Sequence, residues 1–251
     1  MGKHRPVNRL LRKQERGRGK AQVVETPKQL NHIMWVASRG DLGVRNVAIL
    51  WMLFGAGMRI NEVPQLLVSD VVYPSGALKK AFVIRGTYTK TSNPRAAYIL
   101  ADAHRQALAR WLRQRQEESI RTSEDGSYGG LNPKSPLFLV KVGKSWRNYS
   151  FAPKKYIDKE GVERSTMVCR SIENMVRALL KSAGLHYGSS HSGRRTLANW
   201  LDRKGHDLEL IQRILGHESP DMTLGYIDPY LPRIENAFRN IWRNINWLDG
   251  I

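Results

Sequence analysis

Apolar residues recur at helical spacing along most of this chain, which predicts a mainly helical protein. Thr26 and Pro27 are good residues for a helix start, and Gly40 is a good stop, so the first helix is expected between them. Residues 43–54 are apolar on most sides and predict a buried second helix. Further helices are predicted from Arg59 onward, at 102–118, at 171–183, near 194–204, at 207–215 and at about 231–247.

Two short runs break the helical pattern. Residues 81–86 (AFVIRG) and 95–100 (RAAYIL) are β-branched or alternating, and TYTKTSNP separates them, which predicts a hairpin with Lys90 in its turn region. Residues 119–165 are irregular and rich in glycine and lysine, with a strand expected at 135–140 and a small hairpin at 156–164. The predicted fold class is α+β, mainly α, with a small antiparallel sheet.

Composition narrows the class of protein. The longest apolar run, residues 47–54, is shorter than the roughly 18 residues of a membrane span, and the N-terminus has no apolar signal segment. The single cysteine, Cys169, excludes an intramolecular disulfide, fits a reducing cytosol and is expected in the core. We therefore expect a cytoplasmic protein.

Charge points to the partner. Lysine and arginine number 41 against 22 acidic residues, a net charge of +19, which steers polyanions to the surface. Residues 1–25 are predicted to be a flexible basic arm that contacts DNA, although a solubility tail is the alternative. The arm carries Lys3, Arg5, Arg9, Arg12, Lys13, Arg16, Arg18 and Lys20 against Glu15 alone. Charge by itself fits a generic basic protein equally well.

The candidate chemistry lies between residues 191 and 226. His191 and Arg194 share a helix face, Gly216 ends a helix just before His217, and Tyr226 follows nine positions later. A tyrosine hydroxyl with a pKa of about 10 is a poor nucleophile at neutral pH. Fixed cations beside it make the phenolate accessible, which suits attack on a phosphodiester.

These motifs resemble those of the tyrosine recombinases, the phage-integrase family. GMRINEV at 57–63 looks like the family's first box, and HSGRR at 191–195 with LGH at 215–217 and Tyr226 looks like its second. TKTSNPR at 89–95 looks like the hairpin turn that carries the family lysine. The resemblance covers roughly residues 27–247, so residues 26–251 are expected to form a tyrosine recombinase catalytic domain.

The resemblance implies a site-specific DNA recombinase or integrase of a mobile element or phage, which needs no cofactor and no metal. Tyr226 would attack the scissile phosphate and form a 3′-phosphotyrosyl bond. The other expected catalytic residues are Arg59 and Arg194 as the phosphate clamp, Lys90 as the general acid, His191 and His217 as proton-transfer and hydrogen-bonding groups, and Glu62 as support. The rivals are a catalytically silent DNA-binding regulator or accessory factor and a topoisomerase-like enzyme.

The chain also departs from the family pattern. Gly193 stands where most members carry leucine, and Arg195 where many carry histidine. Arg95, Arg195, Lys144 and Arg147 are expected to contact double-stranded DNA, the last two from an insertion at about 119–165. Residue 57 leaves no room before it for a core-binding domain, so we expect a homo-oligomer on DNA, a tetramer by the resemblance, or help from an accessory DNA-binding protein. The tail helix could dock on a neighbouring subunit or pack in cis.

Overall fold

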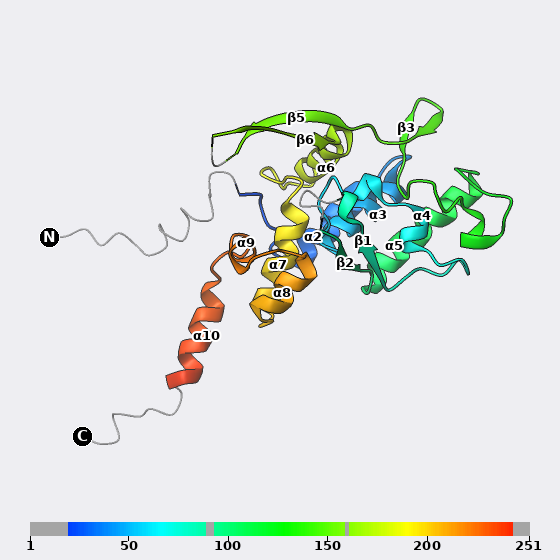
Figure 1. The fold of residues 1–251 in the computed structure, drawn as a ribbon. Coiled ribbons are helices and arrows are strands. Elements are labelled where there is room, and N and C mark those ends of the chain that lie inside the picture. Colours follow the sequence, from blue (N-terminus) through cyan, green and yellow to red (C-terminus); the bar gives the residue numbers. More distant parts are fainter. Residues whose placement is uncertain (1–19, 89–92, 159–160, 243–251) are drawn as a thin grey trace, which may run out of the picture.

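The computed structural model describes residues 20–88, 93–158 and 161–242, and helices are the predominant secondary structure there (Figure 1). The α-helices are α2 (Pro27–Ala37), α3 (Gly43–Phe54), α4 (Val68–Val71), α5 (Asp102–Glu117), α6 (Arg170–Ser182), α7 (Ser192–Arg203), α8 (Leu208–Leu215), α9 (Pro220–Leu224) and α10 (Leu231–Trp242). Short 3-10 turns are η1 (Val63–Gln65), η2 (Gly86–Tyr88) and η3 (Ser127–Gly130). The predicted helices at 43–54, 102–118, 171–183 and 207–215 are confirmed within about a residue.

Helix α3 lies at the centre of the core. Helices α2, α5 and α7 all pack against it, and Ile49, Leu50 and Met52 are fully buried. This explains why the helix is apolar around most of its circumference rather than along one stripe. A smaller apolar cluster under α7 and α8 consists of Ala198, Ile211 and Leu215, and Tyr226 packs against it.

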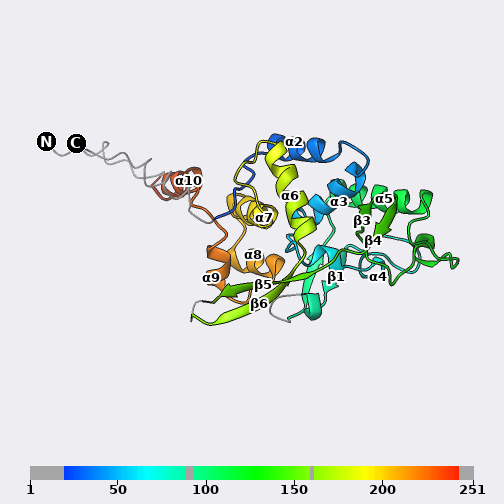
Figure 2. The same ribbon diagram turned by 90° about the horizontal axis from the view of Figure 1, so that it is seen from above.

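The strands form three separate two-stranded antiparallel sheets. Strand β1 (Ala81–Ile84) pairs with β2 (Arg95–Tyr98), β3 (Val140–Val142) with β4 (Ser145–Arg147), and β5 (Ala152–Ile157) with β6 (Glu163–Val168). The predicted small hairpin is therefore longer than expected, and β5–β6 runs along the outside of the helical body (Figures 1 and 2).

The strand predicted at 135–140 is wrong for most of its length. Leu137 and Leu139 are buried, but strand β3 begins only at Val140. The Trp111 indole N–H and the Arg115 guanidinium donate to the Leu137 carbonyl oxygen at 2.8 and 3.3 Å. Side chains of α5 thus take a backbone acceptor that a neighbouring strand would otherwise satisfy.

The helix predicted from Arg59 is also wrong. Gly57 has φ +59°, a left-handed conformation that favours glycine, and residues 60–62 form turns before η1. The Glu62 carboxylate accepts the Arg59 backbone N–H at 2.7 Å. Leu66 then has an extended backbone (φ −61°, ψ 137°), so the chain forms only turns and the short η1 here.

The basic arm predicted for residues 1–25 is too long. Ala21, Val23 and Val24 are buried. The Val24 N–H donates to Thr196 Oγ1 at 3.0 Å, and the Trp200 indole N–H donates to the Val24 carbonyl at 2.8 Å. Residues 21–25, here called the N-terminal segment, are thus anchored on α7, whereas residues 1–19 lie outside the described part of the chain.

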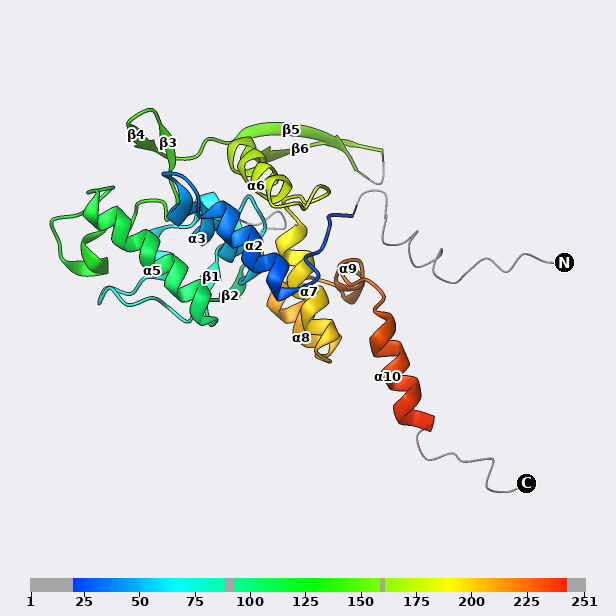
Figure 3. The ribbon, with the colours of Figure 1, turned by 180° about the vertical axis from the view of Figure 1, so that it is seen from behind.

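The predicted tail helix is present as α10, and it leads away from the body of the protein (Figures 1 and 3). Its apolar residues Ile234, Phe238 and Ile241 are 45%, 61% and 68% exposed, so they are not packed in cis. Residues 243–247 of the prediction lie outside the described residues. Among the helices that the structure describes, none combines the length and apolar character that crossing a bilayer requires.

Candidate active site

Arg194 is the most buried cation of the candidate site. It lies in the first turn of α7 and is 1% exposed. Its guanidinium donates from Nη1 to the Gly57 carbonyl at 2.6 Å and from Nη2 to the Leu215 carbonyl, while Nε has no described partner. Burial first, and then the charges of Arg59 and Arg95, lower the pKa of Arg194 to about 9, so the group stays charged at neutral pH.

Glu62 joins two further arginines beside it. The carboxylate is 1% exposed and accepts from Arg95 Nη2 at 2.6 Å and from Arg59 Nη1 at 3.1 Å. Burial alone would raise the pKa of Glu62, but the charge and hydrogen bonds of Arg95 and Arg59 outweigh it and lower the pKa below the usual value. One buried carboxylate thus orders two guanidinium groups, and it leaves a positive charge in excess.

His217 follows the end of α8, as the sequence predicted. Gly216 ends that helix with φ +60°, the conformation expected of a C-cap glycine. The His217 Nδ1 lies 2.9 Å from Thr223 Oγ1, and Nε2 is buried without a described partner. Burial first, and then Arg194, Arg59 and Arg95, lower the pKa of His217 to about 3, so the imidazole is neutral in the free protein.

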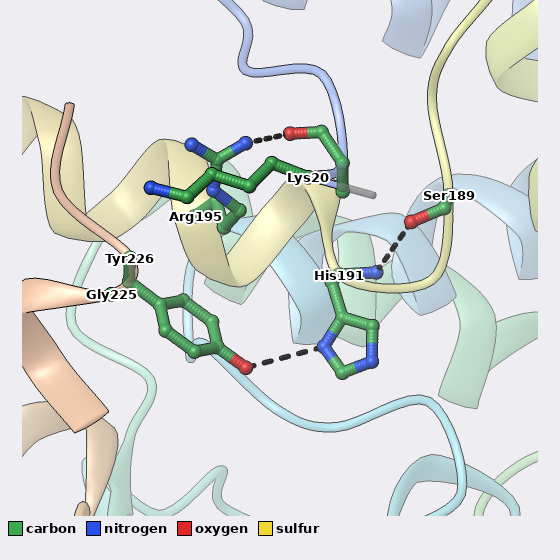
Figure 4. A pocket seen from close by; sticks show the side chains of 7 residues that line it. Lys20, Ser189, His191, Arg195, Gly225 and Tyr226 are labelled. Atoms are coloured by element: carbon green, nitrogen blue, oxygen red, sulfur yellow. Dashed lines mark hydrogen bonds between the residues drawn. The ribbon is translucent and has the colours of Figure 1, made fainter. Parts of the chain in front are cut away.

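Tyr226 lies where these groups meet. Its hydroxyl is 3.2 Å from His191 Nδ1 (Figure 4). Its ring lies 4.8 Å from the His217 ring, and the Arg194 guanidinium carbon is 5.7 Å from the ring centroid. The structure therefore gathers three of the sequence-predicted residues, His191, Arg194 and His217, around the Tyr226 side chain.

His191 is suited to accept the tyrosine proton. The residue is exposed, yet neighbouring atoms crowd it enough that desolvation is the first cause of its lowered pKa, followed by the charges of Arg194 and Arg59. A neutral imidazole in hydrogen-bonding reach of a hydroxyl can act as a general base. Together, His191 and Tyr226 line a cavity of about 200 Å³ with Lys20, Ser189 and Arg195 (Figure 4).

Residues that the sequence did not single out hold Tyr226 in place. The Asn199 amide nitrogen donates to the Tyr226 carbonyl at 2.8 Å, and the Asn199 side-chain oxygen accepts the Asp228 N–H at 2.9 Å. Asn199 is buried one turn after Arg195 on the same helix face. A buried amide on that face was the available signal, whereas nothing local to Asp228 marked its role.

The predicted DNA contacts have different positions. Arg95 and Arg195 are buried in ion pairs with Glu62 and Asp228, so neither offers the free surface guanidinium that the expected backbone contact requires. Lys144 lies in the turn between β3 and β4 and Arg147 in β4, and both are exposed. Lys90 lies outside the described residues. In the part of the chain that is described, no group of three or more His, Cys, Asp or Glu residues is placed to hold a metal ion.

Comparison with known proteins gives a consistent result. The phage integrase family matches residues 24–231. An integrase/recombinase of Escherichia coli is 26% identical over 239 residues, 90% of this chain and 62% of that protein. A tyrosine recombinase XerC of Corynebacterium glutamicum is 29% identical over 195 residues, 78% of this chain and 50% of that protein. The chain thus spans about three-fifths of the length of the first of these relatives and half the length of the second.

Solved structures show the same fold. The crystal structure of XerA recombinase matches with a TM-score of 0.57 and 24% identity, over 92% of this chain and 68% of that one. The XerH site-specific recombinase bound to palindromic difH substrate, a post-cleavage complex, matches with a TM-score of 0.60 and 21% identity, over 90% of this chain and 55% of that one.

Proposed function

Because the chain belongs to the phage integrase family, we propose that it cleaves and rejoins double-stranded DNA at specific sites through a covalent 3′-phosphotyrosyl intermediate on Tyr226. In this proposal it acts on the DNA of a bacterial cytoplasm, to integrate or excise a mobile element or phage. The reaction is a phosphoryl transfer that conserves the energy of the phosphodiester, so it requires no nucleotide cofactor.

One observation carries the proposal: the Tyr226 hydroxyl lies 3.2 Å from His191 Nδ1 within a group of cations. Arg194 Nε and His217 Nε2 are both buried without a described partner. Buried polar groups are normally hydrogen-bonded, so these two nitrogens are candidate partners for a bound phosphate. A phosphate between Tyr226 and these nitrogens would satisfy both of them.

The proposed first reaction transfers the scissile phosphoryl group from the 5′ oxygen of the DNA to Tyr226. The Tyr226 oxygen bonds to phosphorus, its proton passes to His191, and the bond from phosphorus to the 5′ oxygen breaks. Arg59 and Arg194 hold the two non-bridging oxygens and stabilise the charge of the transition state. Lys90, by the family resemblance, gives its proton to the leaving 5′ oxygen. A 5′ hydroxyl from another strand then reverses these steps and completes the exchange.

We also propose that the protein assembles as a homo-oligomer on DNA through α10. The helix presents Ile234, Phe238 and Ile241 on one side, each at least 45% exposed. Such a stripe favours burial against a second copy of the chain. An accessory DNA-binding protein is the alternative source of assembly and of site recognition.

A nicked duplex tests the catalytic proposal. The DNA should carry candidate sites taken from direct repeats, where sequencing beside the gene finds them, with a nick beside the candidate scissile phosphate so that the cleaved fragment is lost. We expect a covalent protein–DNA product with the wild-type chain and none with Tyr226→Phe. Tyr187→Phe is the matched control, because Tyr187 is 82% exposed and away from the site cavity.

Three other results of this experiment would contradict parts of the proposal. Specific binding of the duplex without a covalent product would refute the enzyme and support a regulator. A covalent product that survives Tyr226→Phe would refute the nucleophile. Resealing without exchange between two labelled duplexes would replace the recombinase with a topoisomerase-like activity.

A further inference from the structure

Arg195 connects two distant parts of the chain at the site. From α7, its Nη1 donates to the Ala21 carbonyl of the N-terminal segment, and its Nη2 donates to both carboxylate oxygens of Asp228, at 2.6 and 2.5 Å. Ala21 is 174 positions before Arg195, and Asp228 is 33 after it. The shorter histidine that many family members carry here has no fork of donors that could reach both partners at once.

The burial of this guanidinium makes the connection strong. Arg195 is 6% exposed, so its charge is shielded from water and depends on Asp228 for compensation. Charge-assisted pairs of this kind are stronger and more directional than neutral hydrogen bonds. Loss of Asp228 would leave the buried charge of Arg195 uncompensated, so the two side chains should be set in place together.

Asp228 is only two residues from Tyr226. Asn199, one helical turn from Arg195, binds the Tyr226 carbonyl and the Asp228 N–H, so residues 226–228 are fixed to α7 by main chain and side chain alike. On the other side, Lys20 Nζ lies 3.8 Å from Asp228 Oδ1 and lines the cavity with Tyr226 (Figure 4). The basic residues 3–18 directly precede this lysine in the sequence.

We propose that Arg195 and Asp228 are positioning residues that fix the N-terminal segment and the Tyr226 hydroxyl as one unit. The inference rests on the proposed role of Tyr226 as nucleophile. Its consequence is that the segment leading from the basic arm helps to set the angle of attack on the phosphate. A small misplacement of an attacking atom lowers the rate far more than it lowers affinity.

The test compares Arg195→Met with Arg195→Lys in the full chain. We expect Met to slow covalent complex formation on the nicked duplex about tenfold to a hundredfold in single turnover. Lysine should recover part of that loss, because it keeps the charge facing Asp228. In a Tyr226→Phe background, Arg195→Met should leave DNA affinity unchanged, which separates positioning from binding.

Arg203→Met is the matched control. Arg203 lies on the same helix and pairs with Glu25 of the N-terminal segment at 2.6 Å, but it has no described contact with residues 226–228. The Arg203→Met variant should cleave the nicked duplex at a rate near that of the wild type. An equal loss with Arg203→Met, or a wild-type rate with Arg195→Met, would overturn the proposal.

Amide hydrogen exchange without DNA tests the connection independently of catalysis, and Asp228→Asn serves if Arg195→Met does not fold. Weakening the pair should speed exchange at Gln22, Val24 and Asp228 together, beyond any change at α3. Faster exchange in only one of the two segments would contradict the proposed unit. If the wild-type chain forms no covalent complex, the proposed function fails, while this measurement still decides the coupling.

Discussion

Gly193→Ala tests how closely helix α7, which carries Arg194, packs against helix α3 of the core. Gly193 is the second residue of α7 and directly precedes Arg194. A Cβ added to it would lie 2.7 Å from the carbonyl carbon and oxygen of Leu53 and 3.0 Å from Leu53 Cβ. Those atoms belong to the end of α3, so only a movement of one helix relative to the other could relieve the contact.

The expected magnitude follows from two opposing terms. Alanine in a helix interior is favoured over glycine by about 1 kcal/mol. Overpacking a close helix contact costs about 1–3 kcal/mol. We therefore expect a net destabilisation of up to about 2 kcal/mol, a fall in thermal midpoint of about 2–4 °C per kcal/mol. Because Arg194 moves with α7, cleavage should slow as well, and the family's usual leucine should be worse than alanine.

Calorimetry measures the thermal midpoints of Gly193→Ala and Gly193→Leu, and the rate of cleavage of the nicked duplex is the second readout. Gly126→Ala is the control, because Gly126 has φ −64° and nothing within 4 Å of an added Cβ. It should leave the midpoint unchanged or raise it slightly. If Gly193→Ala is more stable than the wild type, the contact between α3 and α7 yields to the added methyl group, and the reasoning fails.

Further predictions address charge and assembly. Glu62→Gln should lower the free energy of unfolding at neutral pH by about 3–5 kcal/mol, measured in urea, because it leaves excess buried positive charge. Since the pKa of Glu62 is lowered in the folded protein, this difference should shrink as pH falls below 4.5. Burial lowers the pKa of His104 from 6.5 to about 4 in the folded protein, so the free energy of unfolding should decrease by about 3 kcal/mol as the pH is lowered from 6.5 to 4. His104→Leu should abolish that part of the pH dependence. Phe238→Asp should leave the thermal midpoint unchanged but reduce complexes of more than one protomer on DNA in sedimentation. Affinity of the single chain for DNA should fall steeply with salt; a flat response would contradict phosphate-dominated binding.

The predicted elements that were confirmed are those set by local patterns. Helical periodicity located α3 and α5, and a glycine after an apolar helix correctly located the end of α8 before His217. Helix propensity failed after Arg59, where the chain forms turns and the short η1 and then becomes extended at Leu66. Long-range partners could not be predicted either. Arg95 reads in sequence as a surface cation, and only the fold brings it to a carboxylate 33 positions away.

The charge balance of the site suggests how substrate binding and proton transfer are linked. Among the described residues, Glu62 supplies the one carboxylate that pairs within the cluster of Arg59, Arg95 and Arg194, so three positive charges meet one negative charge and leave an excess of two. This excess is among the causes that hold the pKa of His217 at about 3 and keep the imidazole neutral. In the proposed reaction, a scissile phosphate would bring negative charge into the cluster, and more charge would develop on it as Tyr226 attacks. Its arrival should therefore raise the pKa of both histidines, which makes His191 a stronger base at the moment when Tyr226 must lose its proton. In the free protein, burial and then the charges of Arg194 and Arg59 lower the pKa of His191, so the site is expected to become active only when a phosphate neutralises those charges.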